Sequence, residues 1–409
     1  MNKNTTPPHE TVPLAPRLAD GTPDWALLRR EFPATQLTTY LDIARKALLP
    51  CCAAQAAADW FADIESRATG RRAFSMNEVE ITRRVVGETF GATPETLALV
   101  KNTSEAINIV AQGFDWREGD NVVISEAEHE NNTFPWRPLT RRGVEVRVVA
   151  SGPDGRVTTD ALRAAIDPRT RILSIAWVSY GLGERADVDA LAQICRDTGV
   201  LFVIDGIQAI GVLDRRIDDL GAHVVASGGH KAQMSVAGAG LMYVATDALE
   251  RFRPPFAAKY SFATFDRTET EPALAPDAHR FEYGNPNFIG LAVQRRSAQF
   301  IGDIGLGAIE ARIHHLTDLL IELADKAKLK VRTPRPWNER AGIVSFDLEG
   351  ASADKMEAVL EAEDIRVASK DGHLRAAAHF YNNEDDVHRF MDRLQHHLRG
   401  AKDLRGATS

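Results

Sequence analysis

Cysteine is scarce in this chain. Only three of its 409 residues are cysteine, with Cys51 and Cys52 side by side and Cys195 alone. This arrangement forms neither a disulfide framework nor a metal-ligand spacing such as CxxC, so it excludes a disulfide-stapled domain and offers no metal motif. A reducing compartment, the cytoplasm, is therefore expected.

Long apolar runs and an excess of basic residues are also missing. The longest apolar run without charge, residues 172–183, is too short to span a bilayer, and the N-terminus has no apolar signal segment. The formal net charge is −8, and the charges are spread along the chain. These features argue against membrane insertion, nucleic acid and anionic membrane surfaces. A small-molecule partner is the better expectation.

The remaining composition is that of an ordinary globular protein, with 44% apolar and 26% charged residues. Apolar residues at helical spacing alternate with short β-branched runs. The helical segments are 53–66, 78–90 and 104–114, and the runs are 97–100, 121–124, 144–149, 172–178 and 201–204. This alternation predicts an α/β domain with a mostly parallel sheet, in which ligands collect at the carboxyl ends of strands.

The chain is expected to divide into an arm and two domains. Residues 1–23 are rich in Pro, Thr and Asn without periodicity, which is typical of a mobile arm. Residues 24–66 are expected to form a helical segment that packs with the small domain, and residues 67–288 the large domain. Residues 289–409 are expected to form a smaller α/β domain. Its predicted elements are helices 291–304, 307–329, 352–363 and 384–398 and a strand at 342–348.

One segment carries a specific chemical signal. Asp205 follows the apolar run 201–204, and Lys231 follows it later in the sequence Ser-Gly-Gly-His-Lys. Burial among glycines and apolar residues lowers the pKa of a lysine, and a protonated His230 beside it acts in the same direction. The resulting neutral amine attacks an aldehyde such as that of pyridoxal 5'-phosphate (PLP) to form a Schiff base. Asp205 suits the carboxylate that keeps the pyridine nitrogen of PLP protonated.

These residues resemble the signature of a known family. Asp205-x-x-Gln208 followed by Gly229-His230-Lys231 is similar to the signature of the class V aminotransferase superfamily, which includes cysteine desulfurases, isopenicillin N epimerase and related lyases. Further motifs resemble the family in the same order. They lie at residues 40–42, 102–106, 128–129, 135–136, 281–286, 374–375 and 379–382. The resemblance covers about residues 35 to 400 and implies a fold-type I PLP-dependent enzyme.

The resemblance also implies the residues that hold the cofactor. Lys231 would carry PLP as a Schiff base, Asp205 would pair with the ring nitrogen, Gln208 would donate to the phenolic oxygen, and His129 would stack on the ring. A second group would contact the phosphate. Its members are Thr103, Ser104, Ser227, His230 and, from the partner subunit of a homodimer, Asn285. Thr103 and Ser104 also fit a plain helix cap after Asn102, and both interpretations are compatible.

Two arginines are candidates for binding the substrate. Arg375 matches the family's arginine that grips the carboxylate of an amino-acid substrate, as a guanidinium does through two parallel hydrogen bonds. Arg45 lies where the family often has a small residue, and we expect it to face the substrate and to favour one with a second acidic group. A solvated arginine is the alternative for both positions.

The sequence departs from the family pattern at three places. Residues 367–373 lack the cysteine that desulfurases need, so persulfide chemistry is not expected. Tyr180 stands where many members have an asparagine, and its phenol offers a hydrogen bond or, with a lowered pKa, acid–base chemistry. Gly228 replaces a usual serine, with Ser227 one step earlier.

The expected activity is therefore a PLP-dependent reaction at the alpha carbon of an amino acid, either aminotransfer or beta-elimination of the carbon–sulfur lyase type. Epimerisation stays open as an alternative, and a non-catalytic PLP-binding regulator is the alternative from another class. A nicotinamide-dependent dehydrogenase is disfavoured, because no GxGxxG motif follows the early strands.

Overall fold

The computed structural model describes residues 15–67, 73–264, 266, 268 and 270–406. A seven-stranded sheet forms the larger part of the molecule, in the strand order β2-β8-β7-β6-β5-β3-β4. All neighbouring strands are parallel except β8, which runs antiparallel to both β2 and β7. The strands are β2 (Leu97–Val100), β3 (Asn121–Ser125), β4 (Glu145–Val149), β5 (Thr170–Ala176), β6 (Leu201–Asp205), β7 (Val224–Gly228) and β8 (Gly240–Val244).

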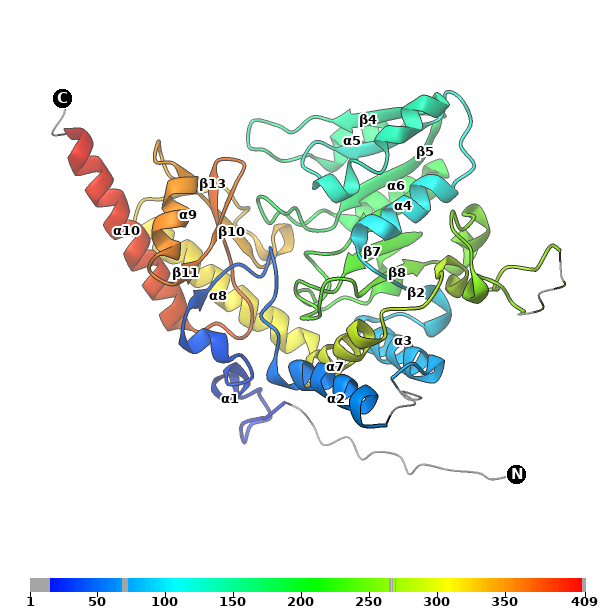
Figure 1. Cartoon of the computed structure of the whole chain (residues 1–409). Coiled ribbons are helices and arrows are strands. Elements are labelled where there is room, and N and C mark those ends of the chain that lie inside the picture. Colours follow the sequence, from blue (N-terminus) through cyan, green and yellow to red (C-terminus); the bar gives the residue numbers. More distant parts are fainter. Residues whose placement is uncertain (1–14, 68–72, 265, 267, 269, 407–409) are drawn as a thin grey trace.

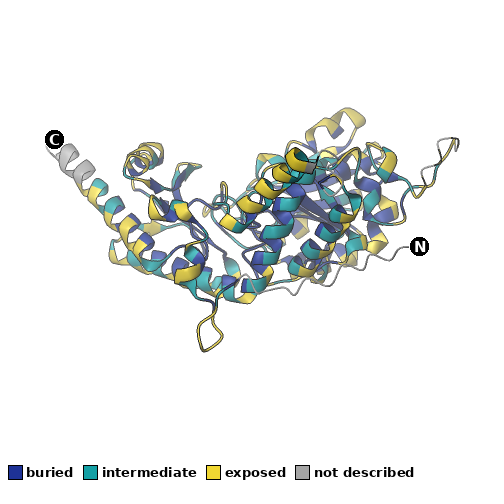
Figure 2. Cartoon of the chain, turned by 60° about the horizontal axis from the view of Figure 1, so that its bottom comes forward, coloured by how far each residue is buried: buried dark blue, intermediate teal, exposed yellow. Residues whose placement is uncertain are grey.

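The central strands are buried on both faces because their apolar residues alternate between two cores. In β6, Phe202 and Ile204 belong to one core, and Leu201 and Val203 belong to the other. This division follows from the two-residue period of a strand and requires helices on both sides of the sheet. Figure 2 shows the buried strands between helices whose outward faces are exposed. The helices are α3 (Met76–Phe90), α4 (Thr103–Gly113), α5 (Thr159–Ala165) and α6 (Val188–Thr198).

A second, smaller sheet lies beside the first (Figure 1). It is antiparallel in the order β12-β13-β10-β9, and a short parallel pair, β1 with β11, accompanies it. Its strands are β1 (Thr39–Tyr40), β9 (Lys330–Val331), β10 (Ile343–Asp347), β11 (Ile365–Arg366), β12 (Ala368–Lys370) and β13 (His373–Ala377). Its helices are α8 (Leu306–Lys326), α9 (Ala353–Glu361) and α10 (Glu384–Gly406).

The N-terminal elements join the two parts. Residue Asp42 pairs with Ala377 at the end of β13, so the chain after β1 continues the small sheet. The long helix α7 (Phe288–Ile304) packs against both α2 (Cys51–Arg67) and α3, below the large sheet in Figure 1. The short helix α1 (Trp25–Arg29) contacts the small part, because Arg29 forms an ion pair with Asp386 at 2.7 Å.

The structure confirms the expected α/β class, the mostly parallel sheet and the second, smaller α/β part. Residues 15–23, expected to belong to the arm, contact the folded chain: Ala15 is buried, and the Arg17 guanidinium donates to the carbonyls of Asp303 and Ile304. The rest of the expected arm lies outside the described residues. In the described ranges no helix combines the length and the apolar character that crossing a bilayer requires.

Candidate active site

The candidate residues gather at one edge of the large sheet. Asp205 ends β6, Lys231 lies three residues after β7, His129 four after β3 and Tyr180 four after β5. Because these parallel strands are neighbours, their carboxyl ends bring the four side chains together. All four line one small pocket, together with Gln208.

A tight loop presents Lys231. The amide of Gly229 donates to the carbonyl of Ala239 at 2.8 Å, and the amide of Ser235 donates to the carbonyl of Gly229 at 2.8 Å. A Cβ at Gly229 would lie 2.6 Å from the Ala239 oxygen, so this close approach requires glycine. The Lys231 side chain is half-buried, and burial lowers the pKa of its ammonium group to about 8. The Asp205 carboxylate opposes this decrease, while the cations of Arg375 and Lys370 add to it.

Two buried carboxyl groups belong to the site, Asp205 in the lining of the pocket and Glu128 next to His129 in the chain. Asp205 is only 3% exposed, accepts a hydrogen bond from the amide of Ile207 at 3.0 Å, and has a pKa that burial raises to about 6. Glu128 accepts from the amide of Ala176 and from the side-chain amide of Asn132. Burial, assisted by the charge of Asp205, raises the pKa of Glu128 to about 8. At neutral pH, therefore, Asp205 carries the negative charge and Glu128 is mostly neutral.

Two rings form another wall. The centroids of the His129 and Tyr180 rings are 5.1 Å apart, with their planes at 86°. Burial lowers the pKa of His129, so its imidazole is neutral at physiological pH. Burial and a hydrogen bond to Asp371 raise the pKa of Tyr180 to about 12. The Tyr180 phenol is thus protonated, which corrects the idea that a lowered pKa makes it an acid–base group.

The N-terminus of α4 lies beside the lysine loop. The amide of Gly228 donates to the hydroxyl oxygen of Thr103 at 3.0 Å, which links α4 to the end of β7. Asn102 caps the helix by accepting from the amide of Glu105 at 2.9 Å, so the expected helix cap is confirmed. The first amides of a helix have no carbonyl partner within the helix, so this end of α4 can accommodate an anion.

Four other expected cofactor residues differ in their surroundings. The side-chain amide of Gln208 donates to the carbonyl of Ala44 at 3.0 Å, which leaves its second N–H available. Ser227 is fully buried, and its hydroxyl accepts from the side chain of Gln233 at 2.6 Å. Asn285 is exposed on the segment before α7. Burial lowers the pKa of the fourth, His230, which is half-buried and next to Lys231.

The arginine expected to bind the substrate lies between the two parts of the molecule. Arg375 is 2% exposed, donates to the carbonyl of Tyr180 at 2.7 Å and pairs with Asp42 at 3.0 Å. Its Nε is buried and has no hydrogen-bond partner in the described part of the chain. A buried guanidinium N–H without an acceptor favours an anionic ligand at this position.

Arg45 has a different environment from the one expected. Its guanidinium pairs with Asp42 at 3.0 Å and with Glu357 at 2.8 Å, and its side chain is 49% exposed. These two carboxylates compensate its charge. Its role in substrate selection stays a prediction that these contacts do not favour.

Residues outside the motif signature contribute to the site. Asp42 belongs to a motif quoted from the sequence, but its bridge between Arg375 and Arg45 joins positions that are far apart in the chain. Glu128 precedes His129 in another of the motifs named from the sequence, where it had no assigned role. Lys370 and Asp371 had no signal except their place in the loop without cysteine. Only the pairing of the small sheet brings that loop to Tyr180.

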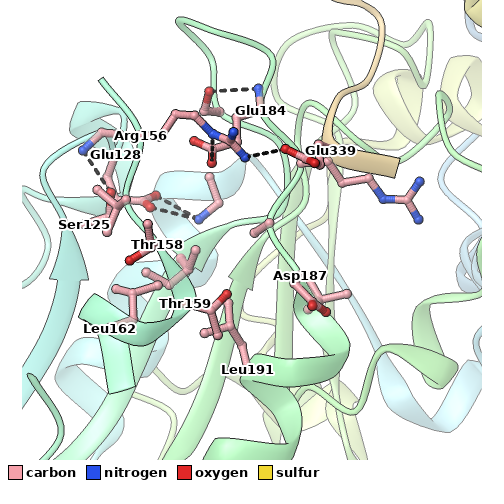
Figure 3. Close-up of a pocket in the computed structure, with 18 of the residues that line it drawn as sticks. Ser125, Glu128, Arg156, Thr158, Thr159, Leu162, Glu184, Asp187, Leu191 and Glu339 are labelled. Carbon is pink, nitrogen blue, oxygen red and sulfur yellow. Dashed lines mark hydrogen bonds and ion pairs between the residues drawn. The ribbon is translucent and has the colours of Figure 1, made fainter. Parts of the chain in front are cut away.

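A larger cavity of about 620 Å³ adjoins the site (Figure 3). It shares Ala176 with the small pocket, and Glu128 is among the residues that line it. Arg156 crosses its wall, pairing with Glu184 at 2.8 Å and with Glu339 at 2.9 Å. Lys231 lines the small pocket and is not among the residues that line the larger cavity, so we place the chemistry in the small pocket.

The donor set of the small pocket fits PLP. PLP requires four groups: an amine of lowered pKa for its aldehyde, a buried carboxylate for its ring nitrogen, an amide N–H for its phenolic oxygen and a helix N-terminus for its phosphate. Lys231, Asp205 and Gln208, which line the pocket, supply the first three, and α4, which contacts the end of β7 before Lys231, supplies the last. A mostly parallel sheet carrying this set at its carboxyl edge defines the class of protein, a fold-type I PLP-dependent enzyme.

Comparison with known proteins identifies the family. The aminotransferase class-V family matches residues 39–391. A probable cysteine desulfurase of Methanothermobacter thermautotrophicus is 28% identical over 391 residues, covering 90% of this chain and 96% of its own. The cysteine desulfurase of Cronobacter sakazakii is 28% identical over 394 residues, covering 90% and 95%. The chain belongs to the aminotransferase class-V family, and it is a PLP-dependent enzyme of the lyase or transferase type that acts on an amino acid.

Solved structures agree with this assignment. The apo cysteine desulfurase of Thermococcus onnurineus NA1 is 26% identical, with a TM-score of 0.84 and coverage of 92% of this chain and 98% of its own. The cystine C-S lyase C-DES, solved with its reaction product cysteine persulfide, is 21% identical, with a TM-score of 0.82 and coverage of 89% and 99%. The second likeness is one of fold.

Proposed function

We propose that the chain is a PLP-dependent lyase that eliminates a substituent from the beta carbon of an amino acid without using a cysteine of its own. The observation that carries this proposal is the pocket itself, in which Lys231, Asp205 and Tyr180 meet and which none of the three cysteines lines. Burial raises the pKa of Cys52 to about 11 and that of Cys195 to about 12, so neither thiol is a ready nucleophile. Cysteine desulfurase relatives support carbon–sulfur substrates.

Each residue has a defined task in this proposal. PLP, when bound to Lys231, supplies an electron sink for the charge that develops at the alpha carbon of the substrate. Asp205 holds the proton of the ring nitrogen, Gln208 donates to the phenolic oxygen, and the His129 ring fixes the ring plane. Thr103, Ser104 and His230 contact the phosphate.

The substrate is positioned by Arg375 and deprotonated by Lys231. Nε of Arg375 donates to the alpha-carboxylate, which provides the acceptor that this buried N–H otherwise lacks. The amine of Lys231, free once the substrate's amine has replaced it, takes the alpha proton. Tyr180 stays protonated and positions Arg375 through its carbonyl oxygen.

A homodimer is part of the proposal. Asn285 is exposed, so its side chain suits a contact with the phosphate in a partner subunit. Sedimentation of the holoenzyme at several concentrations tests this, because a monomer at all concentrations would contradict the shared site.

The experiment that tests the function compares wild type, Lys231→Ala and the control Lys355→Ala, whose side chain is exposed on α9. After incubation with PLP, borohydride reduction and peptide mass spectrometry locate the attachment. The holoenzyme is then given a panel of amino acids, and pyruvate, keto acid and inverted substrate are assayed. Attachment to Lys231 with pyruvate formation supports the lyase. Keto acid with retained side chain indicates aminotransfer, inverted substrate indicates epimerisation, and no turnover with attached cofactor indicates a regulator.

A further inference from the structure

The hairpin of β12 and β13 places a second cation on the same face as Arg375. Its turn consists of Asp371 and Gly372, both with positive φ (51° and 79°), the conformation that tight two-residue hairpins use. In its register Lys370 lies opposite His373, and Ala368 lies opposite Arg375. Because residues opposite each other and residues two apart share a face, Lys370 and Arg375 are on one side of the small sheet.

This side of the hairpin is held against the pocket. Arg375 donates to the carbonyl of Tyr180 at 2.7 Å, and the hydroxyl of Ser345, on the neighbouring strand, donates to the carbonyl of Gly181 at 2.5 Å. Asp371 forms a hydrogen bond with the Tyr180 phenol. The three contacts fix the hairpin over Tyr180, which itself lines the pocket of Lys231.

Lys370 forms no ion pair in the described part of the chain, and the neighbouring carboxylate of Asp371 interacts with the Tyr180 phenol. Arg375 and Arg45 are balanced by Asp42 and Glu357, so these four groups together are neutral. Lys370 is half-buried and, in the part of the chain that the structure describes, has no ion pair or hydrogen bond from its amine. Its charge acts on the pocket, because it helps burial to lower the pKa of both Lys231 and His129.

A half-buried lysine buries its methylene stem and keeps its amine accessible, so the amine of Lys370 can reach an anion at the pocket. In the proposed function, Arg375 already binds the alpha-carboxylate of the amino acid. The amine of Lys370, on the same face and without an ion pair among the described residues, is available to a second negative group on the ligand.

We propose that Lys370 selects the substrate by binding a second negative group at the end of its side chain. The substrate class is then an amino acid with a terminal oxyanion, such as a carboxylate or a sulfonate. This inference rests on the proposed function, and it transfers from Arg45 to Lys370 the expected recognition of a second acidic group.

The test measures binding to holoenzyme rather than turnover. The probes lack an amine and therefore cannot replace Lys231: succinate and 3-sulfopropionate carry two negative groups, and butyrate carries one. Their dissociation constants are measured by isothermal titration calorimetry for wild type, Lys370→Gln, Lys370→Arg and the exposed control Lys355→Gln. Covalent PLP on Lys231 is verified first in every variant.

The expected result is a preference for at least one dianionic probe over butyrate of tenfold or more in the wild type, which corresponds to about 1.4 kcal/mol. Lys370→Gln should abolish the preference without weakening butyrate, whereas Lys370→Arg and Lys355→Gln should retain it. A merely structural Lys370 would weaken all probes alike and would overturn the inference. Equal affinity of wild type for all probes would also overturn it and leave the function standing, whereas failure to attach PLP would remove both.

Discussion

The amine of Lys231 should react with PLP much faster at neutral pH than an ordinary lysine does. The reacting form is the neutral amine, and burial lowers the pKa of Lys231 from 10.5 to about 8. At pH 7 roughly one molecule in ten then carries a neutral amine, against roughly one in 3,000 for an unperturbed lysine. The structure therefore predicts an advantage of about 300-fold from protonation alone.

The assay mixes apoprotein with PLP in amine-free buffers between pH 6 and 10 and follows the cofactor's absorbance by stopped flow. Because PLP itself titrates in this range, the reaction of Nα-acetyl-lysine is measured under the same conditions, and the ratio of the two rates is plotted. We expect the ratio to be largest at low pH and to fall as pH rises from about 8 toward 10.5, where the reference amine also becomes neutral.

A ratio that is constant across this range would refute the reasoning, because it would mean that Lys231 titrates like a free lysine. Lys370→Gln provides a check on the direction. This substitution removes a cation that lowers the pKa of Lys231, so the ratio of the two rates should begin to fall at a higher pH than in wild type. Lys355→Gln, at an exposed position on α9, should leave the profile unchanged.

Three further predictions concern buried polar groups. Arg83 is fully buried and pairs with Glu282, so Arg83→Ala should lower the free energy of unfolding in urea by about 3–5 kcal/mol, whereas Arg84→Ala, next to it and exposed, should cost less than about 1 kcal/mol. Thr103→Val leaves the buried amide of Gly228 without its acceptor and should cost about 1–3 kcal/mol, and Thr103→Ser, which keeps the hydroxyl, should restore most of it. The pKa of Glu128 is raised in the folded state from 4.5 to about 8, so its contribution to stability is full below about pH 4.5 and is lost as pH rises toward 8. Wild type should therefore lose stability relative to Glu128→Gln across that window by up to roughly 1.4 kcal/mol per pH unit, and parallel pH profiles would contradict the shift.

Much of the fold was predictable because it depends on local patterns. Apolar residues alternate in β6 and recur at helical spacing in α4, and each pattern shows which faces of the element are buried. Burial of apolar surface is the dominant favourable term in folding. The rule that ligands collect at the carboxyl ends of parallel strands then brings Asp205, His129 and Lys231 to one pocket. The structure places them there, although the roles carried over from the family remain predictions.

The charge balance of the site was not predictable in the same way. In the sequence Arg45 looked like a free cation, because its ion-pair partner Glu357 lies more than three hundred residues later and no local pattern predicts that contact. Lys370 was hidden for the same reason, since its face is set by the register of β12 on β13. A local pattern does not determine long-range strand register or the partner of a long side chain. For this reason the recognition of a second acidic group, which the sequence assigned to Arg45, is now proposed for Lys370.

These charges link substrate binding to the strength of the base. Arg375 and Lys370, both in the small part of the molecule, help to keep the pKa of Lys231 low, while Asp205 in the large part raises it. A substrate whose two negative groups bind Arg375 and Lys370 compensates both cations, so the pKa of a freed Lys231 must rise. The same amine is then neutral enough to attach PLP in the resting enzyme and more basic when the alpha proton has to be taken. Because Lys231 must be neutral to take the alpha proton, kcat, which reports the substrate complex, should rise with pH through a midpoint. In wild type this midpoint should lie at higher pH for a dianionic amino acid than for one with a single negative group.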